Sequence, residues 1–233
     1  NSTNIDLSGL ESGVYTIRAS ITDYSGNIEY ATHQIEVDNT APRTTLTDDL
    51  SGKYINQPIL IEGVSTDTNG IDSVNISYRL TGATDWTFLT TIDNTSNDSP
   101  YNFTYEWKPT SDGTYDIKVS ATDIVGNIEE SAYIYALTYD STPPTITVFN
   151  IVSNILNISA SDLLSGTDKI EVKINDGEWI TYTTNMDLNT LLNNTPGTYT
   201  IYARVTDKAG NATESSTTYT IPQPTPATTT PEG

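Results

Sequence analysis

The residues of this chain that could do chemistry are acidic, and they recur in turns. The motif Asp-x-x-Gly-Asn occurs at residues 23–27, 123–127 and 207–211, and further aspartates stand in short linkers and other turns. Carboxylates and turn carbonyls are the ligands that a hard cation such as Ca²⁺ takes. Asp and Asn are also common in turns because their side chains cap the local backbone. No EF-hand spacing is present, so calcium binding and turn formation both stay open as interpretations.

Catalytic constellations find little support in the sequence. His33 is the only histidine, and the absence of cysteine excludes thiolate zinc sites, thiol nucleophiles and disulfides. Glu129 and Glu130 are adjacent in an alternating stretch and should point to opposite faces of a sheet, which argues against a paired-carboxylate site. Glycine-rich phosphate loops are absent. We therefore predict that the chain is not an enzyme and has no cofactor other than a candidate Ca²⁺.

Charge narrows the range of partners. Thirty acidic and ten basic residues give a formal net charge of −20, which repels polyphosphates and anionic lipids. We expect no nucleic-acid partner. No apolar run approaches the roughly 18 residues of a membrane span, and nothing at the start is typical of a signal peptide. We expect no membrane insertion in this fragment and targeting segments outside it.

Each Asp-x-x-Gly-Asn motif ends a longer repeated stretch. Gly-x-Tyr opens the stretch at Tyr15, Tyr115 and Tyr199, and apolar and polar residues then alternate up to the aspartate. Such alternation predicts a half-buried strand that runs into a tight turn. The tyrosines are 115 − 15 = 100 and 199 − 115 = 84 residues apart, a period that fits whole β-sandwich domains.

This pattern resembles the immunoglobulin-like repeats of prokaryotic cell-surface proteins, a group of bacterial and archaeal sandwiches similar to cadherin and fibronectin type III domains. The resemblance rests on Gly-x-Tyr, the alternating strand, Thr-Asp-x-x-Gly-Asn and the Thr-x-Pro linkers at residues 40–42 and 142–144. It covers residues 1 to about 222. It implies an all-β fold of tandem immunoglobulin-like antiparallel β-sandwiches.

The same resemblance implies a function. We expect an extracellular or cell-surface location and a non-catalytic role as a structural spacer, an adhesion segment or a surface-assembly module such as an S-layer or stalk. Expected partners are other domains of the same surface protein, and in addition another protein or a glycan. The alternative is an accessory carbohydrate-binding array of a secreted hydrolase, suggested by Trp86, Trp179 and fifteen tyrosines. Trp107 is expected in the core.

Four segments follow from this interpretation. Residues 1–40 are predicted to be the last three strands of a truncated module, residues 41–141 and 142–222 two complete modules, and residues 223–233 a Thr/Pro-rich linker or tail. The predicted strands are 5–10, 14–22 and 28–37; then 43–47, 58–64, 73–80, 85–92, 101–107, 114–122 and 128–138; then 145–149, 154–160, 168–174, 178–184, 186–191, 198–206 and 212–221. Residues 93–100 are predicted to be an exposed loop.

In an immunoglobulin-like topology, the linker enters a module at the end that carries two of its turns. The linker aspartate should therefore lie near an aspartate of each turn, at two junctions. The predicted ligands of junction calcium ions are Asp38, Asp67, Asp123, Asn127, Asp140, Asp162, Asp207 and Asn211.

Two further sets of residues have predicted roles. Tyr15, Tyr115 and Tyr199 stand where sandwich folds place a tyrosine whose hydroxyl bonds to nearby backbone. Asn-x-Ser/Thr sequons provide candidate N-glycosylation sites, if the host glycosylates its surface proteins. These acceptors are Asn75, Asn94, Asn97, Asn102, Asn157 and Asn193.

Overall fold

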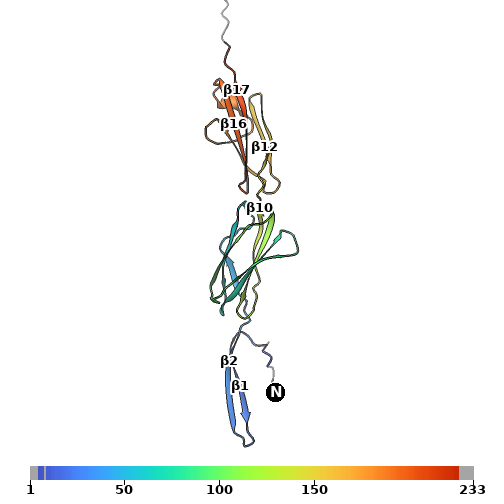
Figure 1. The fold of residues 1–233 in the computed structure, drawn as a ribbon, viewed down its shortest axis with the longest axis vertical. Helices are drawn as coiled ribbons and strands as arrows, with labels where there is room; N and C mark the ends of the chain where they lie inside the picture. Colours follow the sequence, from blue (N-terminus) through green and yellow to red (C-terminus); the bar gives the residue numbers. More distant parts are fainter. Residues whose placement is uncertain (1–4, 8, 226–233) are drawn as a thin grey trace, which may run out of the picture. The chain divides into compact units, whose positions relative to one another are not determined.

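The computed structural model describes residues 5–7 and 9–225, and its elements are β-strands apart from one helical turn (Figure 1). The chain divides into two compact units, residues 1–50, 60–107 and 116–135 and residues 51–59, 108–115 and 136–233. The all-β prediction is confirmed. Residues 226–233 of the predicted tail lie outside the described residues, and among the described ones no helix is long and apolar enough to cross a membrane.

The first two strands form an antiparallel hairpin. β1 (Gly13–Thr22) and β2 (Ile28–Val37) pair from Gly13 opposite Val37 to Thr22 opposite Ile28. The predicted strand at residues 5–10 is wrong, because the described residues there have no strand and the Leu10 N–H donates to the Leu7 carbonyl at 3.1 Å. That bond closes a local turn, which diverts the backbone from a ladder.

A middle sandwich follows, with two sheets. One sheet has the order β3-β5-β8 and the other β4-β10-β9-β6-β7. The strands are β3 (Arg43–Leu46), β4 (Tyr54–Ile55), β5 (Ile59–Thr66), β6 (Ile71–Leu80), β7 (Thr87–Asp93), β8 (Tyr101–Trp107), β9 (Gly113–Asp123) and β10 (Ala132–Tyr139).

The sequence prediction missed β4. This two-residue strand pairs in parallel with β10, with Tyr54 opposite Thr138 and Ile55 opposite Tyr139. Two residues are too few to show an alternating pattern, so only the tertiary partner reveals the strand. The inward residues of the longer strands are buried as the alternation predicts, including Ile61, Val74, Ile76, Phe103, Trp107, Ile117, Val119 and Ile134.

The C-terminal sandwich also has two sheets, of orders β11-β12-β15 and β14-β13-β16-β17. The strands are β11 (Thr145–Val152), β12 (Ile155–Ser161), β13 (Thr167–Ile174), β14 (Ile180–Thr181), β15 (Met186–Asp187), β16 (Gly197–Asp207) and β17 (Ala212–Ile221). Its buried core consists of Leu156, Ile158, Val172, Leu188, Ile201 and Ala203.

One predicted strand of this sandwich is largely a helical turn. Residues 186–191 form β15 and then α1 (Leu188–Leu191). The Asp187 carboxylate accepts hydrogen bonds from the N–H groups of Asn189 and Thr190, so it caps the turn at its N-terminus. Capping competes with extended pairing, and Leu188 still reaches the core from the helix.

Candidate metal centre

Three aspartates from separate segments of the first compact unit converge. Asp38 follows β2, Asp67 follows β5 and Asp123 ends β9. Each offers a carboxylate oxygen, and these oxygens lie within 4.8 Å of one another. We call this set the Asp38 cluster.

A second set repeats the arrangement inside the second compact unit. Asp140 follows β10, Asp162 follows β12 and Asp207 ends β16, and their carboxylate oxygens again lie within 4.8 Å of one another. We call this set the Asp140 cluster. In both sets the linker supplies one carboxylate and two turns supply the others. The six aspartates that the sequence singled out are the members of these two sets.

The turn aspartate of each cluster is fixed by its own motif. Asp123 Oδ1 accepts hydrogen bonds from the N–H groups of Val125, Gly126 and Asn127 at 2.9, 2.7 and 2.8 Å. Gly126 has φ +98°, a conformation that side chains rarely adopt. The carboxylate is therefore held at the end of β9 by three donors, which leaves it little freedom to turn away.

Asn127 and Asn211 complete the turns as donors. Asn127 Nδ2 lies 2.7 Å from Asp123 Oδ2 and 3.1 Å from the carbonyl oxygens of both Asp38 and Thr40. All three neighbours are acceptors, so the amide nitrogen must face them. Nitrogen of an amide does not coordinate Ca²⁺, and this geometry assigns Asn127 to holding the linker and not to binding a cation through this end.

The linker aspartates differ in their hydrogen bonds. Asp38 Oδ1 accepts bonds from the hydroxyl and the N–H of Thr40, and these bonds, with a smaller contribution from the Ser12 hydroxyl, hold the pKa of Asp38 below its usual value. Asp38 Oδ2 is buried, and it has no hydrogen-bond partner among the described residues. Asp140 Oδ1 accepts from Thr142 N–H at 3.0 Å and its Oδ2 from Ser165 N–H at 3.0 Å.

The remaining aspartates belong to the turns after β5 and β12. Asp67 Oδ1 accepts from Asn69 N–H at 2.8 Å, and the Asp67 N–H donates to the hydroxyl of Ser99 at 2.9 Å. Burial acts to raise the pKa of Asp162, but hydrogen bonds from the N–H groups of Gly166, Leu164 and Ser165 outweigh it and lower that pKa. Backbone donors therefore position both carboxylates.

The donor set fits a hard divalent cation. Three carboxylates so close together repel one another, and a cation between them would remove that repulsion. The buried, unpartnered Oδ2 of Asp38 is an oxygen that a cation would satisfy. Asp38, Asp67 and Asp123 would hold one ion, and Asp140, Asp162 and Asp207 another.

Asp112 is a residue of this region that the sequence prediction missed. Its carboxylate accepts hydrogen bonds from Ser141 N–H, the Ser141 hydroxyl and the Thr142 hydroxyl at 2.9, 2.7 and 2.5 Å. Asp112 lines a surface pocket of about 390 Å³ together with Asp140 and Asp162. The sequence feature that could have indicated Asp112 is its position directly before Gly-x-Tyr, where the first repeat has Ser12.

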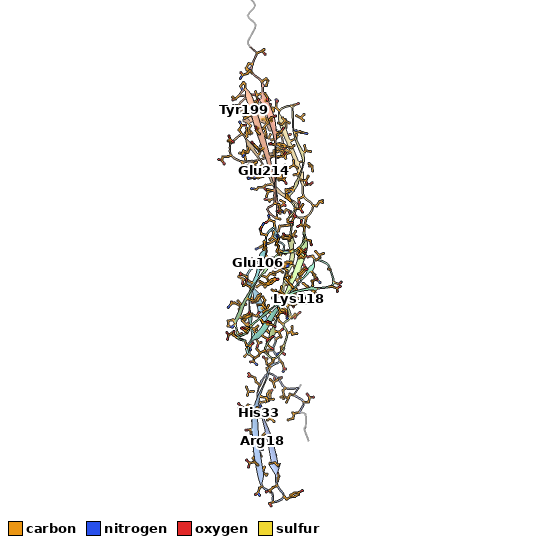
Figure 2. All side chains as sticks on the ribbon, in the orientation of Figure 1. Arg18, His33, Glu106, Lys118, Tyr199 and Glu214 are labelled. Carbon is orange, nitrogen blue, oxygen red and sulfur yellow. The ribbon has the colours of Figure 1, made fainter. Side chains whose placement is uncertain are left out.

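The three repeated tyrosines make the same bond. The hydroxyls of Tyr15, Tyr115 and Tyr199 donate to the carbonyl oxygens of Glu11, Ser111 and Thr195 at 2.9, 2.7 and 2.9 Å. Each bond spans four residues, so each tyrosine ties the start of its strand to the preceding turn. Figure 2 labels Tyr199.

Both tryptophans of the alternative sugar-binding hypothesis lie beneath cations. Arg79 Cζ and Lys118 Nζ lie 4.4 and 5.1 Å from the centre of the Trp86 ring. Arg204 Cζ and Lys173 Nζ lie 4.2 and 5.0 Å from the Trp179 ring. Cations over an indole stabilise the fold, and a sugar ring would compete with them for the ring face that they cover.

The candidate glycosylation sites differ in exposure. Asn94 is 4% exposed, and its Nδ2 donates to the carbonyls of Ile71 and Asp98 at 2.8 and 2.9 Å. Its amide nitrogen is therefore unavailable in the folded protein, and the predicted loop 93–100 is partly packed. Asn97, Asn102 and Asn193 are exposed, whereas Asn75 and Asn157 are half-buried.

The residues considered for catalysis belong to different segments of the fold. His33 is exposed on β2, on the hairpin that also carries Arg18 (Figure 2). Glu129 instead binds strand β3, because its carboxylate accepts from Thr44 N–H, from the Thr44 hydroxyl at 2.5 Å and from Ala121 N–H at 3.2 Å. Its role in this arrangement is structural.

Comparison with known proteins gives matches to two family models. One described as a bacterial Ig-like domain matches residues 39–136 and 191–221, together more than half of the chain, and one described as a bacterial Ig-like domain of group 3 matches residues 99–189. None of the curated proteins matches.

Two solved structures are similar at low identity. One is a tetra-tandem repeat in the extending region of a large adhesion protein, with 22% identity and a TM-score of 0.35 over 94% of this chain and 59% of that chain. This chain thus spans less than two thirds of that structure. The other holds fibronectin(III)-like modules of Clostridium thermocellum CbhA, with 16% identity and a TM-score of 0.37 over 78% of this chain and 95% of that one.

Proposed function

The chain belongs to the bacterial Ig-like domain family, and from this premise we propose that it is a non-catalytic extracellular segment, a spacer or adhesion module whose linkers bind calcium. The observation that carries the calcium proposal is the repeated set of three aspartates, one from a linker and two from turns. The same geometry arises twice from segments far apart in sequence. Turn formation alone explains each aspartate in its own turn, but it does not explain why three carboxylates converge.

Calcium at these positions would have a structural effect. Each ion would join a linker carboxylate to two turns of the sandwich that follows the linker in sequence. It would replace repulsion between carboxylates with coordination, and so restrain the linker. A restrained linker suits a segment that transmits force or holds other domains apart.

The non-catalytic role rests on the chemistry of the side chains. His33 is exposed on a hairpin, and Glu129 is engaged by backbone and hydroxyl donors. The extracellular location is the setting in which millimolar calcium is available to weak sites. Labelling intact host cells with an antibody to this segment should give a signal before lysis; a signal that needs lysis would contradict the location.

A thermal melt tests the calcium proposal. Calcium at about a hundredfold above Kd should add about 2.7 kcal/mol to the free energy of unfolding relative to chelator. At about 4–8 °C per kcal/mol for a domain of 60–100 residues, this is a rise in Tm of about 11–22 °C. Asp123→Ala and Asp207→Ala should each reduce that rise. Asp176→Ala, in the exposed turn after β13, is the matched control and should keep it. Superimposable melts of the unaltered chain would leave the aspartates as turn formers only.

A further inference from the structure

We propose that the two clusters are not equivalent: the Asp38 cluster is the tighter calcium site and needs the ion to order its linker, whereas the Asp140 cluster is already held by bonds within the protein. This inference rests on the calcium binding proposed above. It adds a ranking of the two sites and assigns calcium control to one linker.

The first step concerns the linker carboxylates. Asp38 Oδ2 is buried and has no hydrogen-bond partner among the described residues. The other oxygen, Oδ1, bonds Thr40 of the same linker. A buried acceptor without a donor is unfavourable, and an ionised one more so. In the Asp38 cluster, a cation would therefore supply an interaction that the protein itself does not.

The equivalent oxygen in the second cluster already has a donor. Asp140 is fully buried, and its Oδ2 accepts a hydrogen bond from Ser165 N–H at 3.0 Å. The turn that supplies this donor, residues 162–166, has one residue more between its aspartate and glycine than the turn at residues 67–70. The shorter turn has no position equivalent to Ser165. A cation at Asp140 would thus add less to what the fold provides.

The linker at residues 140–144 also has further bonds. Asp112 accepts three hydrogen bonds from Ser141 and Thr142. The Asp140 N–H donates to the Ile55 carbonyl at 2.9 Å, and Asn56 Nδ2 lies 3.1 Å from Asn211 Oδ1. Charge-assisted bonds such as those of Asp112 are stronger than neutral ones. These contacts restrain the linker without an ion.

The first linker has a weaker counterpart to Asp112. Ser12 occupies the equivalent position, and its neutral hydroxyl accepts one hydrogen bond from Asn39 N–H at 2.9 Å and also helps to lower the pKa of Asp38. Asn39 Nδ2 adds a neutral bond to the Leu10 carbonyl at 2.8 Å. Residues 38–42 are therefore held by fewer charged bonds than residues 140–144. Removal of calcium should loosen the first linker and leave the second nearly unchanged.

Two measurements on the whole chain test this ranking. The first is a calorimetric titration of CaCl₂ into chelator-treated protein, for the unaltered chain and for Asp38→Asn and Asp140→Asn. We expect two steps; Asp38→Asn should weaken the tighter one by about tenfold or more, since it removes the unpartnered anion, and Asp140→Asn should leave that step within about threefold. The second is hydrogen exchange of the unaltered chain with and without CaCl₂, which needs no variant to fold. Peptides spanning residues 38–42 should gain protection, and those spanning 140–144 should change by less than about twofold.

The outcomes separate the two proposals. If CaCl₂ gives neither heat nor protection, calcium binding fails and this inference fails with it. If calcium binds but the steps are equal, if Asp140→Asn removes the tighter step, or if both linkers gain equal protection, the ranking is wrong while calcium binding stands.

Discussion

The side-chain nitrogen of Asn211 lies 2.8 Å from the carbonyl oxygen of Asp140 and 2.8 Å from the carboxylate of Asp207. One amide group therefore ties a linker to the turn between β16 and β17. Asn127 makes the corresponding bonds to Asp38 and Asp123. In two of its three copies, the Asn of Asp-x-x-Gly-Asn thus joins chain segments 71 and 89 residues apart.

Removing this amide should destabilise the protein even in chelator. Asn211→Ala removes the side-chain donor of Asp207 Oδ2 and of the Asp140 carbonyl, while Asp207 Oδ1 keeps the backbone N–H of residue 211. This loss should lower the free energy of unfolding by about 2 kcal/mol. Thermal melts in chelator measure the loss.

Asn27→Ala is the matched control for that variant. Asn27 Nδ2 bonds Asp23 Oδ2 at 2.8 Å in an exposed turn, so its loss should cost less than about 1 kcal/mol. Equal losses in the two variants would mean that the linker bond contributes nothing.

The tyrosine hydroxyls should contribute according to burial. Tyr115 is 3% exposed and bonds the Ser111 carbonyl at 2.7 Å, so Tyr115→Phe should cost about 1–2 kcal/mol. Tyr15→Phe, in the exposed hairpin, should cost less. Urea unfolding followed by fluorescence gives both values, and a larger loss for Tyr15→Phe would contradict the burial argument.

Glycans should leave the tryptophan emission unchanged. Each of Trp86 and Trp179 has two cations over its ring, so a neutral sugar would compete with a cation–π contact. Titration of soluble polysaccharides against intrinsic fluorescence checks this. A saturable shift that Trp179→Phe abolishes would instead restore the sugar-binding alternative.

Strand β3 and strand β11 should be anchored by different chemistry. Glu129 accepts three hydrogen bonds from Thr44 and Ala121. Thr213 holds the equivalent position, two residues after the Asn of its motif, and donates one hydrogen bond to the Pro144 carbonyl at 2.6 Å. Glu129→Ala should cost about 2–3 kcal/mol and Thr213→Val about 1 kcal/mol. Hydrogen exchange should show the Glu129→Ala loss at residues 43–46, and an unchanged strand β3 would refute the anchor.

Acid should weaken the bonds of Asp112. Burial acts to raise the pKa of Asp112, but hydrogen bonds from Thr142 and Ser141 outweigh it and place that pKa below the ordinary value of 3.8. Because the folded-state pKa is the lower one, this stabilisation is present above about pH 3.8 and is lost as the pH falls through the folded-state pKa. Melts between pH 7 and 2 should therefore show a smaller acid-induced loss for Asp112→Asn. Thr142→Val should reduce this difference in acid-induced loss between the chain with Asp112 and the Asp112→Asn variant. An unchanged difference would mean that a partner other than Thr142 stabilises the Asp112 carboxylate.

Periodicity in the sequence predicted most strands because their side chains alternate over eight or more residues between core and solvent. β9 and β16 are the clearest cases, since Gly-x-Tyr and Asp-x-x-Gly-Asn mark both ends. The sequence did not predict β4, because its two residues are too few to show a period. It did not predict α1, because the Asp187 cap forms a helical turn within a stretch that has a strand pattern. The Asn94 sequon was misjudged as accessible for a similar reason: polarity indicates a loop but not its packing.

The sequence by itself determined the sandwich class, the repeats and the six aspartates, because alternation, turn residues and linker prolines act over short distances. Only the tertiary structure decided which oxygens have donors. It shows that Asn127 and Asn211 hold linkers, that Asp112 joins the second linker, and that Asp38 Oδ2 lacks the partner that Asp140 Oδ2 finds in Ser165. Those distinctions depend on how segments many residues apart pack against each other, and no local pattern encodes them.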